Sequence, residues 1–477
     1  MATDERPCLE NLCFELVEGI LSHVDDYKDM LNAMCSSRLV HSVFKASSRK
    51  LLSQVVHNIV EPEARQMALV AFYCDKDRLP LYKSPENNSP LLQFPFELPF
   101  PTEELEIVEF FYFCKMVQSV AERLISKSQA YNADMLQQND TVSPLTPKDL
   151  QHKTERPQLG NSSPALSLAS LTAGSRGRFQ ARLYQYEFLI RAMKYNEHGH
   201  PEADYNPSRW RAWFLNKLDI VEIIQLSTIY AWLDNDYRAW EFDFHTSVVE
   251  EVAEADRISS SQGISTVPIP IETFPLRYLF CQPGEPIGGV GFLGMLHSFG
   301  LKLYKELGEA TSAKRNELIH RAHNMLDFTG PHVDRFLDHF LVYCFKRQWN
   351  FEVLAELQLP NTYLEKYSKM LQTFRSWPGV SPPRDYLIKT GWWLWDDADL
   401  SRMHFEQHPI FHEPICKERM KRIVFDTIRH SPGLRSPQKS AGAMISTGKY
   451  LLPRSVWEEF FAKYGFKGTG YRDLLQR

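Results

Sequence analysis

Residues 12–24 read LCFELVEGILSHV, and their apolar side chains repeat at the spacing of a helix. The positions that recur every three or four residues are Phe14, Val17, Leu21 and Val24, and two more apolar residues, Leu16 and Ile20, flank them. Two acidic residues, Asp25 and Asp26, then interrupt the pattern. The stretch therefore predicts a short amphipathic helix near the start of the chain.

Two further helices are expected directly after it. The second spans residues 29–45, where Asp29 is placed as an N-cap or a first-turn acid, and the third spans residues 47–59. A three-helix module over residues 8–57 is too small to bury much apolar surface by itself. It therefore needs either a partner protein or the rest of the chain.

The remainder of the chain divides by composition. Residues 58–131 contain long helical patterns and are expected to form an extension that packs on the core. Residues 132–178 contain no Phe, Tyr or Trp, which predicts a disordered linker or insertion. Aromatic residues return from position 179, so residues 179–477 are predicted to form an aromatic-rich helical domain.

The overall composition favours helices. The 477 residues include 30 Phe, 20 Tyr and 10 Trp, which is too aromatic for a disordered protein, and the 22 Gly and the scarce Val/Ile/Thr alternation argue against a sheet-rich fold. A net charge of −5 argues against a general nucleic-acid binder. We therefore expect an all-α protein in which a small N-terminal module precedes a larger, irregular helical domain.

The cysteines and the N-terminus bear on the compartment. None of the eight cysteines forms a C-x-x-C pair, and their scatter is typical of reduced thiols in the cytosol or nucleus. Residues 1–10 lack the apolar run of a signal peptide, and no stretch approaches 18 uninterrupted apolar residues. The expected location is the cytoplasm, the nucleus or both, with no membrane partner.

Motifs for catalysis are weak. Gly289, Gly291 and Gly294 spell G-x-G-x-x-G, but turn sequence precedes them where a dinucleotide site needs a strand. A histidine cluster does not have the H-E-x-x-H spacing of a zinc protease; its members are His320, His323, His332 and His339. We therefore expect no catalytic residue, no metal and no cofactor. A metal- or nucleotide-dependent enzyme built on one of these clusters remains a minor alternative.

Tryptophans gather in two places. One group lies among arginines and consists of Trp210, Trp213, Trp232 and Trp240, and residues 391–397, GWWLWDD, carry three more indoles. Both groups are expected in the core, with arginine stems packed beside the rings. The alternatives are base stacking for the first group and an exposed partner patch for the second.

The first stretch resembles the opening of an F-box, usually L-P-x-E-[LI]-[LI]-x-x-I-[LF]-x-x-L. The matching positions are Leu12, Glu15, Leu16, Val17, Ile20, Leu21 and Val24, whereas Cys13 replaces the proline. Residues 30–44 resemble the next F-box helix, without the Trp often found near its end. Residues 179–187, FQARLYQYE, and 391–396, GWWLWD, resemble the R-A-L-Y-R-Y-E and G-W-x-x-W-D segments of large filamentous-fungal F-box-like proteins.

This resemblance implies that the module docks the Skp-type adaptor of a cullin–RING ubiquitin ligase, while the larger domain selects an unknown target protein. The residues expected to bind the adaptor are Leu12, Phe14, Leu16, Val17, Ile20, Leu21, Leu31, Met34 and Cys35. One alternative is that these helices simply pack on the C-terminal domain. Another is a helical interaction or scaffold protein with no ligase link.

Overall fold

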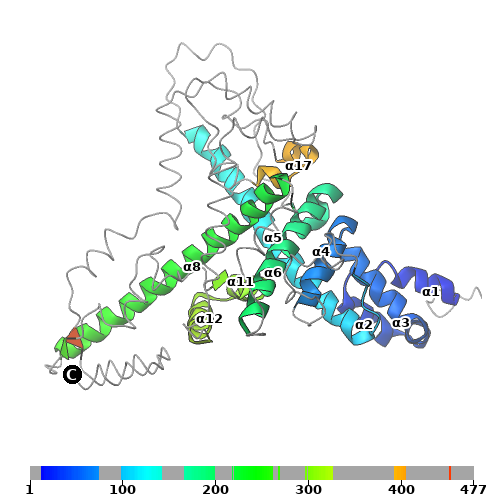
Figure 1. Ribbon diagram of the computed structural model, residues 1–477, viewed down its shortest axis with the longest axis horizontal. Coiled ribbons are helices and arrows are strands. Elements are labelled where there is room, and N and C mark those ends of the chain that lie inside the picture. The colour runs from blue at the N-terminus through cyan, green and yellow to red at the C-terminus, as the bar shows by residue number, and fades with distance from the viewer. Residues whose placement is uncertain are drawn as a thin grey trace, which may run out of the picture. The chain divides into compact units, whose positions relative to one another are not determined.

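The structure is a computed structural model of the whole chain. It describes residues 12–74, 98–141, 166–198, 218, 220–261, 267–268, 296–297, 299–325, 391–403 and 451–452. Within these ranges the secondary structure is helical, apart from one antiparallel pair formed by β1 (Val267–Pro268) and β2 (Leu451–Leu452). The expected all-α fold is therefore confirmed (Figure 1).

The chain divides into two compact units. Unit 1 comprises residues 1–229 and 384–412, and unit 2 comprises residues 230–383 and 413–477. Unit 1 contains α1 (Phe14–Leu21), α2 (Tyr27–Ser36), α3 (Arg38–Ile59), α4 (Pro62–Tyr73), α5 (Glu104–Thr141), η5 (Leu168–Ser170), α6 (Ala173–His198), η6 (Trp392–Leu394) and α17 (Asp397–Arg402). Unit 2 contains α11 (Gly300–Glu309), α12 (Ser312–Met325) and the strand pair. The helix α8 (Ile220–Ser261) begins in unit 1 and continues in unit 2.

The first three helices differ from the sequence-based boundaries at two places. Ser37 has an extended backbone and its hydroxyl accepts a hydrogen bond from the Leu39 amide at 3.2 Å, so it ends α2 and caps α3. The expected helix over residues 29–45 is therefore two helices. The expected break near residue 46 is instead a kink at Ser47 (φ −124°, ψ 21°), and α3 continues through it.

The core of unit 1 surrounds α6. This helix packs against α4 and α5 (Figure 1). It is buried on every side from Phe179 to Ile190 apart from the half-buried Ala181. Polar residues in that run are buried as well, and each therefore needs a partner. The Gln180 side chain meets this need at the α3–α4 junction, where its amide nitrogen donates to Ile59 O at 2.7 Å and its oxygen accepts from Glu61 N at 2.8 Å.

The stretch expected to be a linker, residues 132–178, is helical at both of its ends. At one end α5 continues to Thr141, and at the other η5 and the start of α6 lie before residue 179. The intervening residues 142–165 lie outside the described residues. Any linker between these helices is thus shorter than the 132–178 stretch that the composition predicted.

Unit 2 is built around aromatic side chains of α8 and α11. The ring of Tyr304 lies 5.2 Å from that of Trp240 and 5.7 Å from that of Tyr237, measured between centroids. His297 is buried and stacks on Tyr230 at 4.5 Å. Trp232 and Trp240 are both buried, which confirms the expected core role for these two indoles.

Candidate interaction surface

The nine residues expected to bind a partner separate into buried and accessible groups. Val17 and Leu21 are buried, and Leu12 and Met34 are half-buried. Cys35 is exposed, and four large apolar side chains are exposed with fractional exposures of 38% for Phe14, 55% for Leu16, 51% for Ile20 and 37% for Leu31. We call Phe14, Leu16, Ile20 and Leu31 the exposed apolar set.

The geometry of α1 explains this separation. Val17 and Leu21 are four residues apart, so they share one side of the helix, and that side packs on α3. Leu16 and Ile20 are also four residues apart and lie on the flank of the buried side, whereas Phe14 lies on the opposite flank. The apolar side of α1 is therefore wider than the part of it that α3 covers.

Polar contacts hold α1 on α3. Lys50 Nζ lies 3.1 Å from Glu18 Oε2, and hydrogen bonds from Ser47 and Lys50 lower the pKa of Glu18 below its ordinary value. After the end of α1, Asn58 Nδ2 donates to two backbone carbonyl oxygens, Ser22 O at 2.8 Å and Val24 O at 2.9 Å. These contacts fix the direction in which Leu16 and Ile20 point.

The helix α2 is attached to α5 of the same unit. The ring of Tyr27 lies 5.9 Å from that of Phe111 and 6.1 Å from that of Tyr112. Burial raises the pKa of Tyr27, and the neighbouring Tyr112 and Glu104 add to the rise. Because Tyr27 and Met30 point inward and Leu31 does not, α2 also keeps one apolar side chain in solvent.

The two aromatic segments singled out in the sequence meet in unit 1. The Phe179 and Trp395 ring centroids are 4.9 Å apart, and Arg178 Nε donates to Leu394 O at 3.1 Å. Three indoles of η6 and its end, Trp392, Trp393 and Trp395, are buried, which confirms the expectation that they anchor this segment in the core. The turn that leads into η6 needs a left-handed residue, and Gly391 (φ 65°) supplies it.

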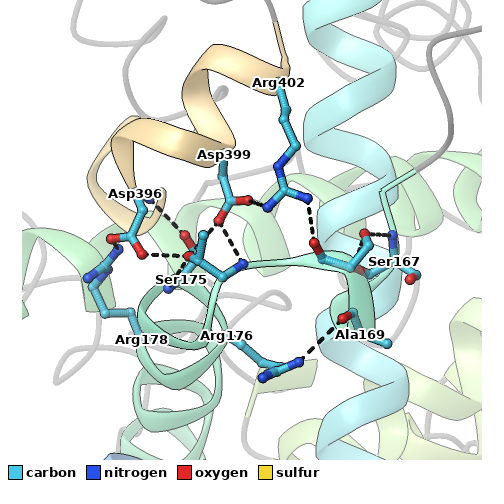
Figure 2. A network of polar contacts seen from close by, with 10 residues as sticks. Ser167, Ala169, Ser175, Arg176, Arg178, Asp396, Asp399 and Arg402 are labelled. Carbon is cyan, nitrogen blue, oxygen red and sulfur yellow. Dashed lines mark hydrogen bonds and ion pairs between the residues drawn. The ribbon is translucent and has the colours of Figure 1, made fainter.

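A closed polar network joins the start of α6 to α17 (Figure 2). The Thr172 hydroxyl contacts Asp396 Oδ2 and lies 2.8 Å from Asp399 Oδ2, and the Asp396 amide donates to Ser175 Oγ at 2.7 Å. Arg178 pairs with Asp396, and Arg402 pairs with Asp399. Since these carboxylates are already held by hydroxyl, amide and guanidinium donors, the network fits a structural role better than a catalytic one.

A buried cation, Arg182, lies further along α6. The Arg182 guanidinium donates to Gln225 Oε1 at 3.0 Å, to Gln185 Oε1 at 2.5 Å and to Glu222 Oε1 at 2.7 Å. Gln225 in turn donates to the backbone carbonyl oxygen of Trp393 at 2.8 Å, so side chains of α6 and of the start of α8 are hydrogen-bonded in one chain to the backbone of η6. Sequence reasoning missed this arrangement, and the available signal was a charged residue inside an aromatic run.

The weaker sequence motifs are placed only in part. His320 and His323 belong to α12, and no group of three or more His, Cys, Asp or Glu side chains in the described part of the chain could hold a metal ion. The glycines at 289–294, two of the four clustered histidines, and Trp210 and Trp213 lie outside the described residues.

None of the helices in the described part of the chain combines the length and the apolar character that a membrane-spanning segment requires. Comparisons of the sequence with protein-family models, and of the chain with curated proteins and solved structures, found no match.

Proposed function

We propose that this chain is an F-box-like adaptor that links a target protein to a Skp–cullin–RING ubiquitin ligase. The observation that supports the proposal is the concentration of the exposed apolar set. Seven large hydrophobic residues of the described chain are exposed, and four of them fall between residues 14 and 31. Single exposed apolar residues are ordinary, but four on the first two helices, with Leu16 and Ile20 together on one flank of α1, fit a docking surface.

The way the module is mounted also supports docking. The buried side of α1 rests on α3, and α2 packs on α3 and contacts α5 through Tyr27, so the module is held without using the exposed apolar set. Partner helices that covered Leu16 and Ile20 would remove apolar surface from water, and each Å² buried would stabilise the complex by about 25 cal/mol. The larger helical part of the chain is then available to select the target.

Binding of a purified Skp-type adaptor to the purified full chain tests the proposal, by isothermal titration. We expect the Leu16→Ala, Ile20→Ala double variant to bind at least about 100-fold more weakly, because each truncated hot-spot side chain costs about 2 kcal/mol. Ile258→Ala in α8 removes an exposed isoleucine elsewhere and should bind as the wild type does. Since Leu16 and Ile20 are half exposed, the double variant should keep its helicity and its melting temperature.

A second candidate is a helical interaction or scaffold protein with no ligase link. The attachment of α2 to α5 through Tyr27 favours it, because the module is already part of a larger unit. Failure of the wild-type chain to bind the adaptor at micromolar concentration would favour this candidate. If the wild type and the folded double variant bound the adaptor equally well, Leu16 and Ile20 would not be part of the adaptor interface.

A further inference from the structure

The helix α3 departs from helical geometry at one residue, Ser47, and the side chains around this kink hold carboxylates from two other helices. Ser47 and Lys50 both hydrogen-bond to Glu18 of α1. The Ser48 hydroxyl donates to Glu104 Oε1 at the first residue of α5. The kink is therefore the point at which α1 and α5 are both tied to α3.

The two carboxylates differ in how their charge is balanced. Glu18 has the ammonium group of Lys50 at 3.1 Å. Glu104 is exposed, and within the described residues no Lys or Arg forms an ion pair with it. The contact between Ser48 and Glu104 consequently depends on the hydroxyl proton. A group that replaced this proton with negative charge would turn the attraction into repulsion.

Basic residues flank the same serine in the sequence. Lys45 lies three residues before Ser48 and Arg49 directly after it, both are exposed, and neither forms an ion pair with a carboxylate of the described chain. The 22 residues of α3 contain no Asp or Glu. An accessible serine flanked by bases is the chemistry that base-directed protein kinases recognise, and the bases can also bind the phosphate that results.

We propose that Ser48 is a phosphorylation site and that its phosphorylation separates the first turn of α5 from the kink of α3. Ser48 Oγ attacks the γ-phosphorus of a nucleoside triphosphate, the bond to the β-phosphate oxygen breaks, the hydroxyl proton passes to a base of the kinase, and a nucleoside diphosphate leaves. The phosphate ester has no proton for Glu104, and its charge of about −2 turns toward Lys45 and Arg49. This site is independent of the proposed adaptor function.

Hydrogen exchange measures the separation directly. The full chain carries phosphoserine, incorporated during translation, at position 48 or at the control position 42. Ser42 is an exposed serine of the same helix, and its hydroxyl donates to Leu39 O at 2.8 Å instead of to a carboxylate. When Ser48 carries the phosphate, the backbone amides of residues 107–113 should exchange with solvent about tenfold faster than in the unmodified chain. When Ser42 carries it, their exchange rate should not change. Unchanged exchange with phosphate at Ser48 would overturn the proposal.

The variant Glu104→Gln distinguishes repulsion from a general disturbance of α3. A neutral amide does not repel phosphate, so phosphorylation of Ser48 in this variant should leave the exchange of residues 107–113 unchanged. Persistence of the tenfold effect in the variant would contradict the mechanism.

Modification itself is tested with the full chain, magnesium ATP and a base-directed serine/threonine kinase, followed by peptide mass spectrometry. We expect phosphate on Ser48 and about tenfold slower incorporation in Lys45→Gln, Arg49→Gln. Phosphate found only on other serines, or no incorporation at all, would overturn Ser48 as the site.

Discussion

Two glycines of unit 1 differ in the space around their α-carbons, although both lie inside helices. A Cβ at Gly174 would lie 2.6 Å from Asp396 Oδ2, whereas a Cβ at Gly19 would meet nothing within 4 Å. Asp396 is fixed by Thr172 and Arg178, so it cannot yield without breaking those contacts. We expect Gly174→Ala to lower the free energy of unfolding by about 1–3 kcal/mol.

Gly19→Ala is the matched control for that change. It should raise the free energy of unfolding by about 0.5–1 kcal/mol, because alanine loses less backbone entropy than glycine in a helix. Urea denaturation of the two variants measures both effects. Stabilisation by Gly174→Ala would show that α6 does not need close contact with Asp396.

Burial raises the pKa of the Cys114 thiol to about 12, from an ordinary value near 9. Its neighbour Tyr184, on α6, is also buried and has a pKa well above its ordinary value. Cys13 and Cys35 are exposed, and Cys74 and Cys114 are buried. Brief treatment with iodoacetamide at pH 8.5 should therefore label Cys13 and Cys35 in the folded protein, and label Cys74 and Cys114 only in urea. Peptide mass spectrometry reads the pattern.

The same thiol gives a pH dependence of stability. Below pH 9 it is protonated in the folded and the unfolded chain. As the pH rises from 9 to about 12, the unfolded chain ionises Cys114 while the folded chain does not, so the free energy of unfolding falls. The Cys114→Ala variant should lose less stability than the wild type between pH 8.5 and pH 10.5, measured by urea denaturation. An identical loss in both would exclude this thiol as the cause.

At the scale of elements, the junction between α3 and α4 depends on Gln180. This side chain satisfies Ile59 O and Glu61 N, which lie at the junction, and it is itself buried. Gln180→Met keeps the length of the side chain but leaves both backbone groups without this partner, so we expect a loss of about 2–3 kcal/mol in the free energy of unfolding.

Gln66→Met provides the comparison for this variant. Gln66 is exposed and accepts one hydrogen bond, from Leu98 N at 3.1 Å. Water can replace that bond, so the change should stay within about 0.5 kcal/mol of the wild type. Equal effects of the two variants in chemical denaturation would contradict the role given to Gln180.

The amphipathic pattern of residues 12–24 was enough to predict α1, but not to separate its apolar residues, because Val17 and Leu21 were expected to bind a partner and are buried. It was not enough to predict the end of α2. Apolar positions continue at helical spacing across Ser37, and the break depends on a local competition in which the serine hydroxyl caps the following helix. The hydrogen bonds from Ser47 to Glu18 and from Ser48 to Glu104 likewise could not be predicted, because these carboxylates are distant in sequence.

The burial of the indoles at 392–395 followed from their apolar area alone. That Trp395 packs on Phe179 could not be predicted, because neither periodicity nor composition relates segments about 200 residues apart. The polar partners of Arg178 and Arg182 are likewise defined only by the fold.

At the scale of the whole molecule, unit 1 needs residues 384–412 although they follow most of unit 2 in sequence. A chain ending at residue 383 lacks the buried indoles and Asp396, so Phe179 and Arg178 lose contacts that they make within unit 1. We expect this shorter chain to lose the cooperative unfolding transition of unit 1. Near-ultraviolet circular dichroism measures that transition.

A chain ending at residue 412 keeps all of unit 1 and should retain that transition. Addition of a peptide covering residues 384–412 to the shorter chain should restore it. Cooperative unfolding of the shorter chain without the peptide would mean that the indole segment is dispensable.

The discontinuity of unit 1 also determines when it can finish folding during synthesis. The ribosome completes α1 to α6 long before it reaches Trp392, and residues 230–383 emerge in between. Throughout that interval the side of α6 that η6 and α17 cover stays open, with the Phe179 ring and the Arg178 charge toward solvent. Nascent chains stalled before residue 391 should therefore be held by chaperones that bind aromatic segments, and chains released beyond residue 412 should not.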